Sequence, residues 1–309
     1  MINRLSPWVL ALSMLLVIGV ACAPTPALAP GHSALKVLAT ESFLADIAQN
    51  VAGSRAQIDT LIPIGVDPHS FEPTPADIKK VADSHVLIIN GGGMEAFLER
   101  LLQNAGGNRL LIEASKGLTS RKPAAGEPVD ADNPIDPHFW LDPNNVVQYV
   151  ETIRDGLRQV DPDGAAVYAA NASAYIAKLK ALDQWITAQV QPVSPARRLL
   201  VTNHEEFGYF ADRYGFKIIG AIIPSFSTDA SPSAQQLAQL IGQIRASHAP
   251  AIFLEVSANP QMANQVARET GVKVVTNLYT HSLSDAHGPA PTYIDMMKYD
   301  TQTIVRALE

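Results

Sequence analysis

Four of the eight histidines in this 309-residue chain occupy similar places, each beyond an apolar run of the kind that forms a buried strand. They are His69, His138, His204 and His281, two in each half of the chain. Ligands of α/β proteins bind beyond the carboxyl ends of parallel strands, so these histidines are predicted to meet between the two halves. Four neutral imidazoles suit a tetrahedral Zn²⁺ ion, whereas Mn²⁺ favours more carboxylate oxygen.

A single histidine of this kind, taken alone, is more often a hydrogen-bonded loop residue than a metal ligand. The proline before His69 and His138 is also typical of a simple turn. The other four histidines are interpreted separately: His32 and His248 as solvated, His85 as structural, and His287 as a further candidate near His281. Position alone therefore favours a metal site without identifying all of its ligands.

The elements that must position these histidines alternate between short apolar runs and stretches of helical spacing. Predicted strands cover residues 35–39, 58–62, 86–90, 110–112, 198–202, 217–222, 251–255 and 272–275. Predicted helices cover residues 43–51, 75–82, 94–102, 233–246, 261–270 and 292–308. Such alternation is typical of parallel sheets with helices on both faces.

Residues 164–190 form a long stretch with no glycine or proline after its first residue. This length predicts one helix of about 40 Å. We therefore predict an α/β fold of two lobes, each a mainly parallel sheet with flanking helices, joined by one long helix, with a metal in the cleft between the lobes. The predicted N-terminal lobe spans residues 34–163, the linker helix 164–192 and the C-terminal lobe 193–309.

Residues 1–22 are predicted to be a signal peptide, because the apolar run at 8–21 is too short to span a membrane comfortably. Cys22 closes this run where a bacterial lipoprotein would be cleaved and acylated, although a chance cysteine in a plain secretory signal is the alternative. Residues 23–33 are rich in proline and are predicted to be a tether. The body of the protein is therefore expected outside the cytoplasm.

The composition argues against several other classes of protein. A content of 47% hydrophobic and 17% charged residues is that of a globular protein rather than a disordered chain or a coiled coil. A formal net charge of −7 without a basic stripe speaks against nucleic-acid binding. The single cysteine excludes an intramolecular disulfide and a cysteine-based zinc site.

Several segments resemble, in the right order, the zinc and manganese substrate-binding proteins of bacterial ABC transporters, a group that includes adhesin-like lipoproteins. These segments are DPHSFEPTP at 67–75, DPHFWLDP at 136–143, HEEFGYFADRYG at 204–215 and GPAPTY at 288–293. The resemblance covers residues 35–308 and implies two α/β lobes joined by a long helix around one divalent ion.

The resemblance also implies roles for individual residues. His69 and His138 match the two ligands of the N-terminal lobe, and His204 matches a third that is commonly Glu in manganese binders and His in zinc binders. The fourth position is Asp in many members but His281 in this chain, which favours zinc. Alternatively, His281 swings away and water, or an acid such as Asp285, completes the shell.

Glu255 matches a family acid that would orient a ligand histidine by accepting its other N–H, with a helix N-cap or a surface acid as the alternative. The polar loop at 119–137 lacks the histidines that zinc-specific members often carry there, so this loop does not favour zinc. The implied partner is an ABC permease. The implied protein is a monomer, anchored by lipid at the outer face of the cytoplasmic membrane or free in the periplasm.

We predict that the chain is not an enzyme but captures a divalent metal, Zn²⁺ rather than Mn²⁺, and delivers it to the permease for import. A manganese-specific carrier, a surface adhesin and a zinc hydrolase are the alternatives. The hydrolase would use three histidines with Glu205 or Glu206 as its base, but Gly208 breaks the His-Glu-x-x-His pattern. Metal binding is expected to weaken below about pH 6, where imidazole is protonated.

Overall fold

The computed structural model describes residues 35–122 and 135–309. The predicted signal peptide with Cys22, the tether at 23–33 and most of the loop at 119–137 lie outside these residues. Within the described ranges, no helix combines the length and the apolar character needed to cross a membrane.

The described strands form two four-stranded sheets in which every pairing is parallel. The first sheet has the order β2 (Gln57–Thr60), β1 (Lys36–Ala39), β3 (Val86–Ile89), β4 (Leu110–Glu113). The second has the order β6 (Lys217–Ala221), β5 (Leu199–Thr202), β7 (Ala251–Glu255), β8 (Lys273–Leu278). In each sheet the chain first moves to one side of its first strand and then crosses to the other side. Ligands of such sheets bind beyond the carboxyl ends of the strands where this direction changes.

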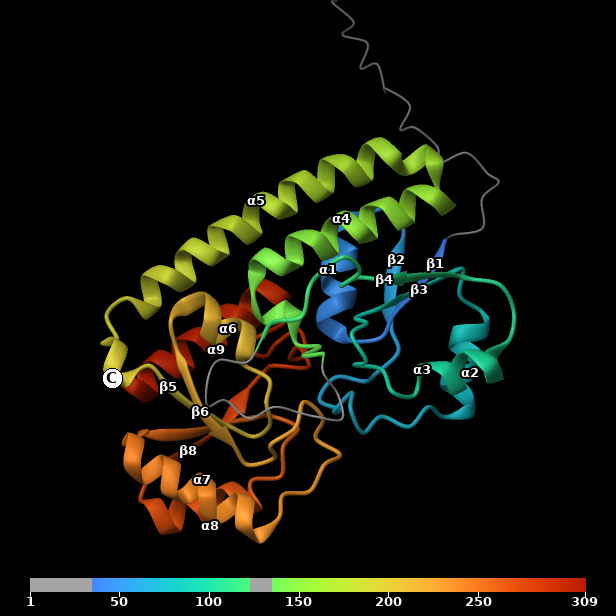
Figure 1. The fold of residues 1–309 in the computed structure, drawn as a ribbon. Coiled ribbons are helices and arrows are strands. Elements are labelled where there is room, and N and C mark those ends of the chain that lie inside the picture. The colour runs from blue at the N-terminus through green and yellow to red at the C-terminus, as the bar shows by residue number, and fades with distance from the viewer. Residues whose placement is uncertain (1–34, 123–134) are drawn as a thin grey trace, which may run out of the picture. The chain divides into compact units, whose positions relative to one another are not determined.

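Helices pack on both sheets (Figure 1). The N-terminal lobe is the first sheet with α1 (Ser42–Ala52), α2 (Pro75–Ala82), α3 (Leu98–Ala105) and α4 (Pro143–Val160). The C-terminal lobe is the second sheet with α6 (Gly208–Tyr214), α7 (Ala234–Ser247), α8 (Gln261–Thr270) and α9 (Tyr293–Leu308). The 26-residue α5 (Ala165–Val190) connects the lobes and runs beside α4. The predicted two-lobe α/β fold with one long connecting helix is confirmed.

The helix α5 stays continuous over about 39 Å because one of its faces is buried along its whole length. The buried residues recur every three or four positions, as helical geometry requires: Tyr168, Ala172, Tyr175, Leu179, Leu182, Ile186 and Val190. This face contacts α1 and α4 of the N-terminal lobe and α9 of the C-terminal lobe. A single apolar cluster accordingly extends from Val37 and Phe43 to Phe253 and Met296. Residues 34–309 form one unit, so the lobe boundaries given above stay predictions.

Two elements differ from the sequence prediction in ways that bear on the site. The helix predicted at 94–102 begins only at Leu98, because Gly91, Gly92 and Gly93 all take positive φ values in a turn after β3. The side chain of Glu95 is drawn back to that turn, where it accepts the N–H of Asn90 at 2.6 Å. In the other lobe, β8 runs to Leu278, so His281 follows its strand by three residues rather than six.

Candidate metal site

The four histidines singled out in the sequence meet between the two lobes. His69, His138, His204 and His281 each offer a ring nitrogen, and these nitrogens all lie within 4.8 Å of one another. The six distances between ring centroids fall between 5.0 and 5.6 Å. Four points separated by six nearly equal distances lie at the corners of a tetrahedron, which is the geometry that Zn²⁺ adopts in protein sites.

Loops at the carboxyl ends of the strands position these histidines. His204 follows β5 and His281 follows β8, whereas His69 lies on the loop after β2. His138 lies at the start of the short 3-10 helix η1 (Phe139–Leu141). All four side chains are buried: His138 and His204 are 0% exposed, His281 4% and His69 8%.

The two Asp-Pro-His segments form the same local turn. Oδ1 of Asp67 accepts the backbone N–H of His69 at 3.0 Å, and Oδ1 of Asp136 accepts that of His138, also at 3.0 Å. An aspartate that bonds to the backbone two residues later is a common way to fix a turn. The proline between the two residues holds the chain extended into this turn. The repeated Asp-Pro-His motif therefore fixes the direction of the backbone at each histidine.

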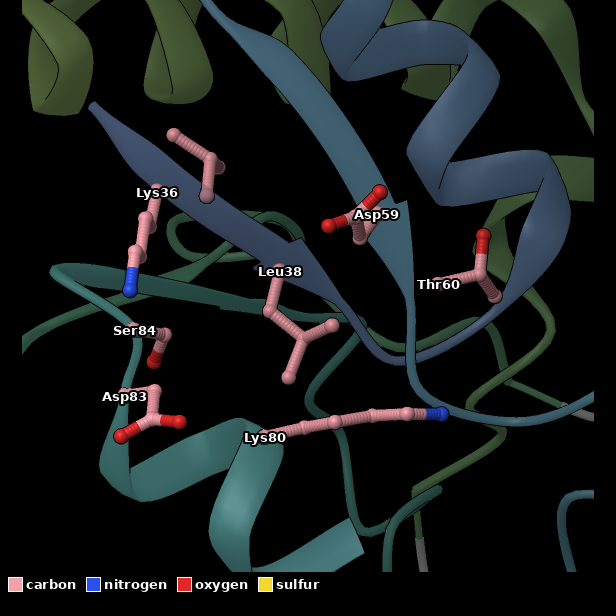
Figure 2. A pocket seen from close by; sticks show the side chains of 8 residues that line it. Lys36, Leu38, Asp59, Thr60, Lys80, Asp83 and Ser84 are labelled. Atoms are coloured by element: carbon pink, nitrogen blue, oxygen red, sulfur yellow. The ribbon is translucent and has the colours of Figure 1, made fainter. Parts of the chain in front are cut away.

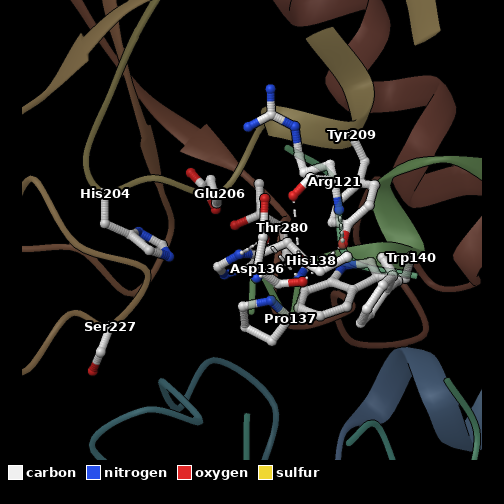
Figure 3. Close-up of polar contacts among 12 residues, drawn as sticks. Arg121, Asp136, Pro137, His138, Trp140, His204, Glu206, Tyr209, Ser227 and Thr280 are labelled. Atoms are coloured by element: carbon white, nitrogen blue, oxygen red, sulfur yellow. Dashed lines mark hydrogen bonds and ion pairs between the residues drawn. The ribbon is translucent and has the colours of Figure 1, made fainter. Parts of the chain in front are cut away.

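Carboxylates lie beside three of the four rings. Figure 3 shows two of these carboxylates, those of Asp136 and Glu206. Nδ1 of His138 is 2.9 Å from Oδ1 of Asp136, and Nδ1 of His204 is 3.5 Å from Oε1 of Glu255. Nδ1 of His281 is 2.9 Å from Oγ1 of Thr280 and 3.5 Å from Oε2 of Glu206. A ligand histidine commonly donates its second N–H to such a group, which fixes the ring and raises its basicity.

The opposite ring edges have no partner within the described part of the chain. Nε2 of His69, His138, His204 and His281 is buried without any hydrogen-bond partner in the residues described. Buried polar atoms are nearly always satisfied, and a cation bound by all four nitrogens would satisfy these. The donor set therefore fits a tetrahedral divalent metal.

The structure also gives the environment of the other residues that the sequence analysis considers. Asp285, the alternative fourth ligand, is exposed and accepts the N–H of His287, itself exposed, at 2.9 Å. His248 is exposed at the end of α7. His85 accepts the N–H of Lys36 through Nδ1 at 3.0 Å, the structural role predicted for it.

Sequence reasoning missed two of the supporting acids. Asp136 could have been found from the repeated Asp-Pro-His motif, because the same spacing places both aspartates in the same turn. The sequence suggests Glu206 only as the base of a hydrolase. The structure places it, fully buried, behind His281, and nothing in the sequence links these two residues.

Burial lowers the pKa of three of the four imidazoles, whereas nearby carboxylates raise the pKa of the fourth. Burial, with a smaller effect of His204, lowers the pKa of His69 to about 3. The same causes lower the pKa values of His138 and His281 well below the usual value for histidine. Burial would also lower the pKa of His204, but Glu206 and Glu255 outweigh it and raise the pKa to about 9. These pKa shifts favour the neutral form of His69, His138 and His281 and the protonated form of His204.

Hydrogen bonds across the lobes hold the site together (Figure 3). Nε1 of Trp140 donates to the carbonyl of Thr280 at 2.7 Å, directly before His281. The hydroxyl of Tyr209 on α6 donates to the carbonyl of Asp136 at 2.9 Å. Each bond joins the segment that carries a ligand of one lobe to the other lobe, so the geometry of the site depends on how the lobes pack.

A separate cavity of about 460 Å³ lies between α2 and the strands β1 and β2 (Figure 2). Its described lining includes Lys36, Leu38, Asp59 and Lys80 but no histidine. Among its charged lining residues, Lys80 pairs with Asp77 and Asp83 pairs with Lys79. This cavity is not part of the metal site.

Replacing Asp136 by alanine is expected to weaken zinc binding about 10- to 100-fold, because the ring of His138 loses the acceptor that orients it. Asp136→Asn should lose less, since its amide oxygen can still accept the ring N–H. Competition with a chromophoric chelator measures both affinities. Asp212→Ala is the control, because it removes a half-exposed carboxylate that pairs with Arg121. Equal zinc affinity of Asp136→Ala and the unmodified chain would refute the role assigned to Asp136.

Comparisons with known proteins identify the family of this chain. The sequence profile of a family described as "Zinc-uptake complex component A periplasmic" matches residues 37–307. The manganese-binding lipoprotein MntA of Halalkalibacterium halodurans is 35% identical over 274 residues, covering 89% of this chain and 88% of that protein. The metal ABC transporter substrate-binding lipoprotein SsaB of Streptococcus sanguinis is 30% identical, covering 93% of this chain and 94% of that protein.

A solved structure shows the same fold. The periplasmic zinc-binding protein TroA from Treponema pallidum superposes with a TM-score of 0.80 at 26% sequence identity, covering 89% of this chain and 99% of that one. Proteins similar to this chain are thus named for manganese, iron or zinc.

Proposed function

This chain belongs to the family of periplasmic zinc-uptake components, and we propose that the metal it captures is Zn²⁺. The family is the extracytoplasmic, metal-binding part of ABC transporters and not an enzyme, so the hydrolase alternative is excluded. The four histidines His69, His138, His204 and His281 are the proposed ligands.

The tetrahedral set of four imidazoles is the observation that carries this proposal. Zn²⁺ has no geometric preference from its d electrons and accepts four nitrogen ligands, whereas Mn²⁺ favours octahedral sites with carboxylate and water oxygens. The carboxylates of Asp136, Glu255 and Glu206 lie beside the Nδ1 atoms of His138, His204 and His281. The Nε2 atoms of all four histidines have no hydrogen-bond partner among the described residues and stay available to a metal. A site of this kind supports a manganese ion poorly.

Delivery to an ABC permease completes the proposed function. The protein is proposed to act as a monomer, attached to the membrane through an acylated Cys22 and released from the signal peptide before it. Its zinc is cargo rather than a catalytic group. The long α5 and the continuous apolar core support a carrier whose lobes move little relative to one another on loading.

Metal competition tests the choice of zinc. The metal-free protein is given equimolar Zn²⁺ and Mn²⁺, desalted, and its metal content is counted per chain; one zinc and no manganese is expected. His281→Asp introduces a carboxylate at the fourth corner and should shift the retained metal towards manganese, whereas His287→Ala, which removes an exposed histidine, should not. Retention of manganese in preference to zinc by the unmodified chain would overturn the proposal.

A further inference from the structure

His69 is the least anchored of the four proposed ligands. It is the most exposed of them, at 8%, and lies on the rim of the cluster. The rings of His138, His204 and His281 each have a polar group behind Nδ1, but within the described residues the ring of His69 has none. Its orientation therefore depends on the position of its backbone.

One carboxylate fixes that backbone from both sides. Oδ1 of Asp67 accepts the N–H of His69 at 3.0 Å, and Oδ2 of the same carboxylate accepts the hydroxyl of Thr228 at 2.6 Å. Thr228 lies between β6 and α7, in the C-terminal lobe. A hydrogen bond to an ionised carboxylate is shorter and stronger than one between neutral groups. The carboxylate of Asp67 thus links the backbone of His69 to Thr228 of the opposite lobe.

The hydrogen bond between Asp67 and Thr228 lies close to the surface, where the loop can separate from the C-terminal lobe. Asp67 and Thr228 are only half-buried, and the neighbouring residues Ile64, Gly65 and Val66 are exposed. The other hydrogen bond between this loop and the C-terminal lobe runs from the N–H of Gly65 to Oγ of Ser282 at 2.8 Å. Local opening is easiest where few contacts are buried, so this loop can separate from the C-terminal lobe while the other three ligands stay anchored.

We propose that Thr228 is a positioning residue that sets the residence time of the metal by holding His69 on it through Asp67. This inference rests on the proposed function as a metal carrier. When the Thr228–Asp67 bond breaks, His69 leaves first and the ion is left with three imidazoles and an open position towards solvent. Release to a partner then proceeds from this opened state.

Stopped-flow release of Zn²⁺ into excess chelator tests the proposal on the full mature chain. Thr228→Val keeps the shape of the side chain but removes the hydroxyl, and is expected to raise the rate of zinc release about tenfold. Thr228→Ser restores a hydroxyl and should return the rate to that of the unmodified chain. Thermal melts of both variants verify that they fold equally well, and Thr228→Ala provides a second hydroxyl deletion.

A second experiment makes the Thr228→Val substitution in a chain that already carries His69→Ala. In a His69→Ala background, Thr228→Val should have no further effect on the release rate, because the residue through which it acts is gone. Equal acceleration in both backgrounds, or no acceleration in the unmodified background, would overturn the role of Thr228. Failure of the unmodified chain to retain zinc would instead overturn the proposed function itself, so the two failures are distinguishable.

Discussion

Replacement of His138 by alanine is expected to reduce zinc affinity about 100- to 1,000-fold. Four-ligand zinc sites bind with apparent free energies of about 10–16 kcal/mol, so an equal share for one ligand is about 3 kcal/mol. His138 is fully buried and its ring is held by Asp136, so bulk solvent cannot easily replace it as a ligand. The loss should exceed that caused by His69→Ala, whose side chain borders solvent.

Affinities of the two variants are measured by competition with chelators of graded strength. His85→Ala is the matched control, since this exposed histidine bonds to the backbone of Lys36 away from the site. Unfolding measured without metal separates loss of a ligand from loss of the fold. An affinity of His138→Ala within a few-fold of the unmodified chain would show that His138 is not a ligand.

Zinc affinity is expected to fall about tenfold for each unit by which the pH drops between pH 8.5 and 6.5. The reason is His204, whose pKa is raised to about 9 by Glu206 and Glu255 despite burial. Below pH 9 the metal must displace one proton from His204. Above pH 9 His204 has no proton to lose, so zinc affinity should stop rising with pH. The structure thus moves the pH threshold upward from the value near 6 expected for an ordinary imidazole.

Calorimetry in buffers of different ionisation enthalpy should accordingly detect release of about one proton per zinc near pH 7.5. Glu255→Gln removes a negative charge beside His204, lowers its pKa and should flatten the upper part of the profile. Asp285→Asn changes an exposed carboxylate and should leave the profile as it is. A flat affinity between pH 7 and 8.5 in the unmodified chain would contradict the assignment of this proton to His204.

Much of the site was predictable because the chemistry of its ligands is encoded locally. Each proposed ligand follows an apolar run that forms a strand, apart from His138, and the carboxyl ends of parallel strands converge by geometry. The Asp-Pro-His turns depend on residues two positions apart, and α5 depends on a stripe that repeats every three or four residues. Such signals survive in a single sequence because the interacting groups are neighbours along the chain.

The carboxylates beside the proposed ligands, and the contacts between the lobes, could be found only from the tertiary structure. Glu255 reaches His204 because β7 pairs with β5, although 51 residues separate these two positions in the chain. Glu206 reaches His281, and Thr228 reaches Asp67, only when elements distant in sequence pack together. The raised pKa of His204 and the tetrahedral arrangement of the rings follow from the same packing. The sequence therefore predicts which histidines could offer a nitrogen to a metal. Their protonation, their orientation and the bond between Asp67 and Thr228 follow from the fold, because these depend on distances between groups that are far apart in the chain.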